Sequence, residues 1–532
     1  MPPANTLTLQ KRSHKIAVVQ KRSHKTAIVL VSAAVALVVA LVVLTVNWPF
    51  TKQAVIKSLQ EASSSTVEIA DFHGTYFPFP GCIAEGVTFR RSSDPNAPPL
   101  ITVGKLTIRS SFIGLVRHRV TQVRAEKLHI IISPSGTAEN SPSHSNPTID
   151  EIVANGAILE FTRSPGKPPL IFAIHESTLR NVGTLRSLSF QVKLSNPEPP
   201  GVIASSGRFG PWKAGDAGQT PVSGDYTFQN ADLGTFHGIA GLLSSHGKFQ
   251  GTLEHIGVQG STDIPNFEVT SSGHSVQLET QFDAFVNAKN GDVMLQQVNS
   301  NFNKTTVTST GNVVGTPGHK GKTATVDMQV SNGRIQDILR MFTKSDEAPM
   351  SGAVSLRARA TIPPGTGPFL KKVELSSDFG VDAGSFKTKT QEHVNQLSAA
   401  SRGENDDNPA TVLSDLNGHV VLREGIATFS NLSFGVPGAS AEMHGTYNLL
   451  TKGIDLHGIL KLDSDLSKTV HGVKSLLLKV MDPFFAKKAG GSVVPFKITG
   501  TYTHPLFGLD LTGNKENKAS KRLQHFYSKP TK

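Results

Sequence analysis

The run Lys320-Gly321-Lys322-Thr323 is the part of this sequence that most resembles a catalytic motif. It matches the end of a phosphate-binding loop, in which the lysine contacts phosphates and the threonine hydroxyl contacts magnesium. That loop also needs a leading glycine and a strand-to-helix junction whose backbone N–H groups hold the phosphate. The position of that glycine holds Thr316, and the flanking residues alternate as strands do. The run therefore does not predict a nucleotide site.

Other residues with catalytic or metal-binding potential also lack the neighbours that such chemistry needs. Cys82 has no histidine or lysine beside it, which favours a small buried residue over a nucleophile. Asp406-Asp407 lacks the alternating ligands and the central glycine of a calcium loop. We predict no catalytic residue, no metal site and no cofactor, and we expect a protein that is not an enzyme. Carboxylates paired across strands, as in glycosidases, remain an alternative.

The sequence does specify strands with one apolar face. Successive side chains of a strand point to opposite faces, so apolar residues at every second position build such a face. This alternation begins near Val67 and is clearest in four segments, at 276–286, 354–362, 454–462 and 494–502. The candidates for an apolar binding surface are Val276, Leu278, Phe282, Val286, Val354, Leu356, Ile454, Leu456, Phe496 and Ile498.

Turn signals and a few helical patterns lie between the strands. Asn290-Gly291, Asn332-Gly333 and Asn417-Gly418 predict tight turns. Apolar spacing predicts short helices over residues 52–63, 231–244, 334–342 and 391–400, and an amphipathic helix over 466–481. The predicted fold class is mainly β, a long, twisted, mostly antiparallel sheet that curls around an apolar groove. A β-sandwich with its apolar faces packed together is the alternative.

The segment 26–46 contains 21 residues and no charge, and six basic residues precede it. An apolar helix of that length spans a bilayer, and the basic residues favour a cytoplasmic N-terminus. Residues 1–25 carry a net charge of +6 and residues 513–532 carry +5, which leaves +1 of the total of +12 for the body. A nucleic-acid partner is therefore not expected, because its binding needs a basic stripe on a folded face.

The sequence resembles the AsmA-like proteins, a bacterial envelope family related to TamB and to bridge-like lipid transfer proteins. The segments that carry the resemblance are 67–70, 86–89, 100–108 and 123–130 after the apolar segment, 247–253 with 258–260 in the middle, and 425–434, 445–449, 494–502 and 504–507 near the end. The resemblance implies an N-terminal β module (47–132), middle β repeats (148–400) and a C-terminal β module (410–512) that includes the amphipathic helix. Composition predicts the other parts, which are a basic cytoplasmic segment (1–25), a transmembrane helix (26–46), a disordered loop (133–147), an acidic loop (401–409) and a basic disordered tail (513–532).

This resemblance implies a function in the bacterial envelope. The chain is expected to be anchored in the inner membrane, with its body in the periplasm, and to bind or conduct lipid acyl chains along the apolar groove during outer-membrane biogenesis. The ten apolar candidates would then face lipid. The expected partners are membrane lipids such as phospholipids, the inner membrane and envelope proteins. A periplasmic scaffold that uses its sheet edge to bind other proteins is the alternative.

Overall fold

The computed structural model describes residues 48–510 except 64, 92–97, 118, 133–147, 163–167, 184–185, 214–215, 237, 316–320, 344–346, 366, 403, 405–407, 464–491 and 502–503. The predicted basic segment 1–25, transmembrane helix 26–46, loop 133–147, amphipathic helix 466–481 and tail 513–532 lie outside the described residues, as does part of the acidic loop 401–409. None of the described helices combines the length and the apolar character that crossing a membrane requires.

The protein is mainly β, as predicted, with 25 strands and few helices among the described residues. The chain divides into two compact units. The first contains Met1–Leu128 and Ala138–Asp150, and the second contains His129–Thr137 and Glu151–Lys532. The strands β4 (Arg119–Ile132) and β5 (Thr148–Asn155) contribute residues to both.

The first unit is built on three antiparallel strands, β1 (Ser65–Thr75), β2 (Gly81–Arg91) and β3 (Ile101–Arg109). Val67 lies opposite Phe89, and Val87 lies opposite Val103, so the alternating apolar residues share one buried face. The predicted helix over residues 52–63 is confirmed as α2 (Lys52–Ser63), which lies against β1 and buries Val55. A shorter helix, α3 (Phe112–Val116), follows β3.

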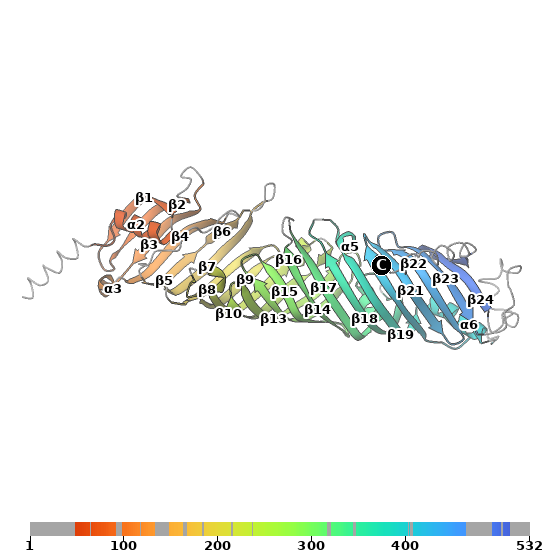
Figure 1. Ribbon diagram of the computed structural model, residues 1–532. Coiled ribbons are helices and arrows are strands. Elements are labelled where there is room, and N and C mark those ends of the chain that lie inside the picture. The colour runs from red at the N-terminus through yellow and green to blue at the C-terminus, as the bar shows by residue number, and fades with distance from the viewer. Residues whose placement is uncertain are drawn as a thin grey trace, which may run out of the picture. The chain divides into compact units, whose positions relative to one another are not determined.

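The second unit is one sheet in which nearly every strand pairs with the next strand along the chain (Figure 1). The pairs whose register is described are antiparallel except that the end of β4 pairs in parallel with β6, which makes the sheet mixed. The strands are β6 (Ala157–Phe161), β7 (Leu170–Val182), β8 (Leu188–Pro197), β9 (Pro200–Phe209), β10 (Pro221–Asp232), β11 (Ile239–Ala240), β12 (Leu242–Thr252), β13 (His255–Val269), β14 (Ser275–Asn287), β15 (Asp292–Phe302), β16 (Thr305–Gly315), β17 (Lys322–Arg334), β18 (Met350–Ile362), β19 (Glu374–Phe386), β20 (Ser414–Arg423), β21 (Ile426–Val436), β22 (Ala439–Asn448), β23 (Gly453–Leu462), β24 (Ser492–Thr501) and β25 (His504–Leu509).

Two of the three predicted Asn-Gly turns are β-bulges instead. Asn290-Gly291 does form the turn between β14 and β15, with Gly291 at a φ of +72°. Asn332, at a φ of 73°, and Asn417 instead lie inside β17 and β20, where the register shifts. A bulge places one extra residue in a strand, bends it and increases its right-handed twist. Similar shifts occur in other strand pairs from β7 to β22, and each is expected to bend its strand locally.

The predicted helix over residues 231–244 is wrong. That segment contains the end of β10, a 3₁₀ turn η2 (Leu233–Thr235), β11 and the start of β12. Gly238 and Gly241 adopt φ angles of +103° and +134°, which a right-handed helix cannot contain. Because glycine adopts such angles readily, the two glycines break the helix that the apolar spacing predicts.

The other predicted short helices are confirmed. The segment 334–342 contains α4 (Ile335–Arg340), and 391–400 lies within α6 (Thr388–Ser401). The remaining described helices are α5 (Phe369–Lys372) and the 3₁₀ turn η1 (Ala217–Gln219).

Candidate functional site: one apolar face of the sheet

One face of the second unit carries apolar side chains across successive strands. Phe282 on β14 lies opposite Gly260 on β13 and Val298 on β15. Leu356 on β18 lies opposite Val330 on β17 and Phe379 on β19. Directly opposed residues point to the same side of a sheet, so these pairs extend the alternation of each strand into a surface. We call this surface, from β8 to β25, the apolar face.

The structure places all ten candidate residues on the apolar face. Following the register from strand to strand brings together Val276, Leu278, Phe282 and Val286 on β14, Val354 and Leu356 on β18, Ile454 and Leu456 on β23, and Phe496 and Ile498 on β24. Val354 and Val276 are buried, with exposures of 1% and 8%, and the other eight are half-buried. The face is therefore oily but retains contact with solvent.

Glycines within the strands explain how large rings fit on this face. A Cβ atom at Gly260 would lie 2.7 Å from the Tyr226 hydroxyl and 3.0 Å from Cζ of Phe282. Gly224 holds the Phe249 ring in the same way, with a Cβ-to-Cζ distance of 2.9 Å. The rings therefore lie across neighbouring glycines, where any side chain would displace them.

Helices cover only part of the apolar face among the described residues. Ile338 and Leu339 of α4 pack against a buried cluster that contains Val330 and Val354. Farther along, Val394 and Leu397 of α6 pack against a second cluster of β21 to β24 residues, namely Val436, Ala439, Ala441, Leu460, Leu462 and Val494. Both clusters lie at β17 or beyond. Phe249, Phe282 and Leu295, on β12 to β15, belong to neither cluster and remain half-buried.

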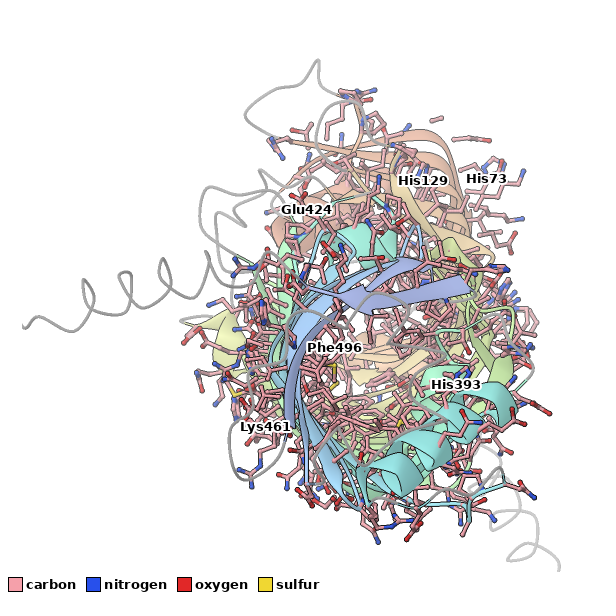
Figure 2. The ribbon with its side chains drawn as sticks, turned by 90° about the vertical axis from the view of Figure 1, so that its right-hand side faces the viewer. His73, His129, His393, Glu424, Lys461 and Phe496 are labelled. Carbon is pink, nitrogen blue, oxygen red and sulfur yellow. The ribbon has the colours of Figure 1, made fainter. Side chains whose placement is uncertain are left out.

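The opposite face of the sheet is polar and carries ion pairs between strands. Arg359 Nε lies 2.6 Å from Asp327 Oδ1, and its hydrogen bond lowers the pKa of that carboxyl. Lys461 Nζ lies 2.7 Å from Glu442 Oε1. Figure 2 shows the blue strands at the C-terminal end curving, with Phe496 on their concave side and Lys461 on the other. The two faces therefore differ in chemistry over the same strands.

One histidine on the polar face contacts two carboxylates. His457 Nδ1 lies 2.7 Å from Asp510 Oδ2, and Nε2 lies 3.1 Å from Asp455 Oδ1. The hydrogen bond to Asp510 is the main cause that raises the pKa of His457 above its ordinary value. Sequence reasoning missed this group because Asp510 is far from the other two residues along the chain.

Two of the residues considered first for catalysis, Lys322 and Cys82, are an ion-pair partner and a buried thiol. Lys322 begins β17, and its Nζ lies 2.8 Å from Asp292 Oδ1, a bond that lowers the pKa of Asp292. Cys82 is fully buried, and desolvation raises the pKa of its thiol to about 12. Within the part of the chain that the structure describes, no group of three or more His, Cys, Asp or Glu residues could hold a metal ion.

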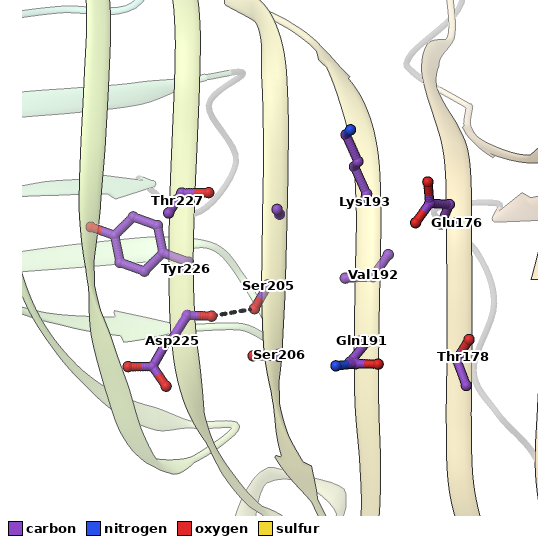
Figure 3. A pocket seen from close by; sticks show the side chains of 11 residues that line it. Glu176, Thr178, Gln191, Val192, Lys193, Ser205, Ser206, Asp225, Tyr226 and Thr227 are labelled. Atoms are coloured by element: carbon purple, nitrogen blue, oxygen red, sulfur yellow. Dashed lines mark hydrogen bonds between the residues drawn. The ribbon is translucent and has the colours of Figure 1, made fainter.

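A polar hollow of about 460 Å³ lies over β7 to β10 (Figure 3). Glu176, Lys193 and Asp225 line it with uncharged residues of the same four strands, and Ser205 Oγ donates a hydrogen bond of 2.9 Å to the Asp225 carbonyl. Asp225 and Lys193 are exposed and alternate with residues of the apolar face. Most of its lining therefore comes from the polar face, and no sequence pattern links its four strands.

Comparison with known proteins finds no match to this chain among protein-family models, curated proteins or solved structures.

Proposed function

We propose that this chain is a membrane-anchored protein, not an enzyme, that binds lipid acyl chains along the apolar face of its second unit. The observation that supports the proposal is the continuity of that face over neighbouring strands whose large side chains are only half-buried. An acyl chain gains about 0.8 kcal/mol for each CH₂ group that leaves water, so an oily wall binds it without any specific polar contact.

The arrangement of the strands also favours binding over a closed core. A β-sandwich needs two sheets with packed inner faces. In the second unit the strands from β6 to β25 instead belong to one sheet, and the helices α4 and α6 supply the apolar contacts at one part of it. Lipid headgroups would remain in water while acyl chains lie along the apolar face, including the strands that α4 and α6 do not contact.

The proposed location follows from the uncharged segment 26–46 and the basic residues before it. We place the anchor in a bacterial inner membrane and the body in the periplasm, in a function of envelope biogenesis like that of the AsmA-like proteins that the sequence resembles. The lipid partner would be a phospholipid or a similar membrane lipid.

Mass spectrometry of lipids that co-purify with the full-length protein after mild detergent extraction tests this function. The proposal predicts phospholipid enrichment over an unrelated single-span membrane protein prepared in the same detergent. A scaffold would instead retain protein partners and show no such enrichment. Lipid recovery equal to that of the control protein would count against acyl-chain binding.

A further inference from the structure

Six large apolar side chains are exposed at one end of the first unit. They belong to the loop between β1 and β2 and to the helix α3, and the most exposed are Phe77 at 85%, Val116 at 79% and Ile113 at 68%. The others are Tyr76, Phe79 and Phe112. Exposed apolar side chains gathered at one end of a unit mark a binding site when nothing within the protein covers them.

Strand pairing brings the loop and the helix together. Thr75 at the end of β1 lies opposite Gly81 at the start of β2, and Gly81 lies opposite Arg109 at the end of β3. The Ser110 N–H then donates a hydrogen bond of 2.7 Å to the Pro80 carbonyl, next to the loop. The loop and α3 therefore emerge at the same end of the sheet.

Hydrogen bonds fix α3 in place although its apolar side chains are exposed. Ser111 Oγ accepts a bond of 3.0 Å from the Gly114 N–H at the helix start. The side chain of Ser110, 1% exposed, donates a bond of 2.7 Å to the Arg119 carbonyl beyond the helix. The exposed side chains thus stand on a fixed support.

The chain enters this unit beside the same loop. The ring centroids of Trp48 and Tyr76 are 4.8 Å apart, and those of Trp48 and Phe50 are 5.9 Å apart. In the sequence, the uncharged segment that we propose as the membrane anchor ends at Val46, two residues before Trp48. Aromatic rings with a polar edge are typical of the membrane interface.

We propose that the loop 76–79 and the exposed face of α3 insert into the interface of the bilayer that holds the anchor. The exposed Arg109 and Arg117 lie at the same end, where they would attract anionic headgroups. Interfacial segments of this kind bury their apolar side about 5–10 Å into the boundary between headgroups and acyl chains. The contact would fix the first unit against the membrane surface. This inference rests on the proposed anchor but not on lipid binding by the second unit.

Site-specific fluorescence on the full-length protein tests the insertion. Phe77→Cys and Val116→Cys, each labelled with a polarity-sensitive dye, would be reconstituted into vesicles of phosphatidylcholine and phosphatidylglycerol that contain lipids with a quencher on the acyl chain. Cys82 is fully buried and does not compete for the dye. The control is Arg91→Cys, an exposed position at the opposite end of β2, about 34 Å from Gly81 at the usual rise per residue.

Insertion predicts that labels at positions 77 and 116 shift their emission to the blue and lose most of their fluorescence to the lipid quencher, while the label at 91 does neither. Quenching at 77 and 116 equal to that at 91 would overturn the inference, as would failure of the protein to float with the vesicles. A blue shift that depends on protein density and not on the lipid quencher would identify a second copy of the chain as the occupant and would also overturn it. None of these readings depends on acyl-chain binding by the apolar face of the second unit.

Discussion

Replacing Phe282 by aspartate should weaken acyl-chain binding without a comparable effect from its neighbour Gln281. Phe282 is half-buried on the apolar face, where its ring lies across Gly260 between β13 and β15. Gln281 precedes it on the same strand, is exposed and points to the polar face. Phe282→Asp and Gln281→Asp introduce the same charge at adjacent positions, so the second variant is a matched control.

The expected magnitude follows from the contacts that the ring makes. A phenyl ring covers about three CH₂ groups of an acyl chain, and full burial of those groups would give roughly 2.4 kcal/mol. Because the ring covers them from one side only, its loss removes about half of that binding free energy, about 1.2 kcal/mol. The new carboxylate adds about 1 kcal/mol or more because an acyl chain that covers it must remove its water. Together these terms predict binding that is about ten- to fifty-fold weaker, since 1.4 kcal/mol is a factor of ten. Gln281→Asp should change affinity by less than about twofold.

Titration of a fluorescent fatty acid into the detergent-solubilised full-length variants measures this difference. Circular dichroism and urea unfolding must first show that Phe282→Asp folds, because loss of a half-buried ring costs about 2 kcal/mol of stability. If it does not fold, Leu356→Asp on β18 replaces it, with Ser355→Asp on the polar face as its control. Equal affinities of an apolar-face variant and its control would refute the assignment of that residue to a lipid-binding surface.

Three further predictions concern single groups. The pKa of His457 is raised, so its ion pair with Asp510 stabilises the fold fully below the ordinary histidine pKa of 6.5, and this contribution is lost as pH rises through the folded-state pKa. His457→Gln should therefore lower the free energy of unfolding, measured by urea titration, by about 1 kcal/mol at acidic pH and by less at pH about 8. A difference between the two proteins that grows with pH would contradict this. The Cys82 thiol, with a pKa of about 12, should resist iodoacetamide in the folded protein and react after unfolding, as read by mass spectrometry; rapid alkylation of the folded chain would disprove its burial. Asp337 of α4 accepts hydrogen bonds of 2.8 Å from Thr305 Oγ1 and 3.1 Å from the Lys304 N–H, so Asp337→Ala should lower the free energy of unfolding by about 2 kcal/mol. Arg340 is exposed on the same helix, so the control Arg340→Ala should lower it by less than about 0.5 kcal/mol. Equal losses of unfolding free energy in the two variants would show that these hydrogen bonds contribute nothing.

The strands and their apolar side could be predicted because both depend on local alternation. Leu278, Phe282 and Val286 are spaced by even numbers, so any extended conformation places them together whatever their partners are. The register between neighbouring strands then places Leu356 and Ile498 on the same face of the sheet as these three residues.

Features that depend on distant partners could not be predicted. Asn332-Gly333 has the sequence of a tight turn, but the pairing of β17 with β18 continues past it and leaves a bulge. The bond between His457 and Asp510 joins residues that only the sheet brings together. The exposed loop at Phe77 and the helix at Ile113 likewise become neighbours through the pairing of β1, β2 and β3.

Photo-crosslinking along adjacent positions of three strands tests the central claim most directly. Benzoylphenylalanine would replace Phe249, Phe282 or Phe379 on the apolar face, and Lys248, Gln281 or Asp378 on the polar face, in the full-length protein within its native membrane. An open apolar face that binds acyl chains predicts lipid adducts, identified by mass spectrometry, at the three phenylalanine positions and not at their neighbours. Lipid adducts that occur equally at both sets of positions, or at neither, would contradict it.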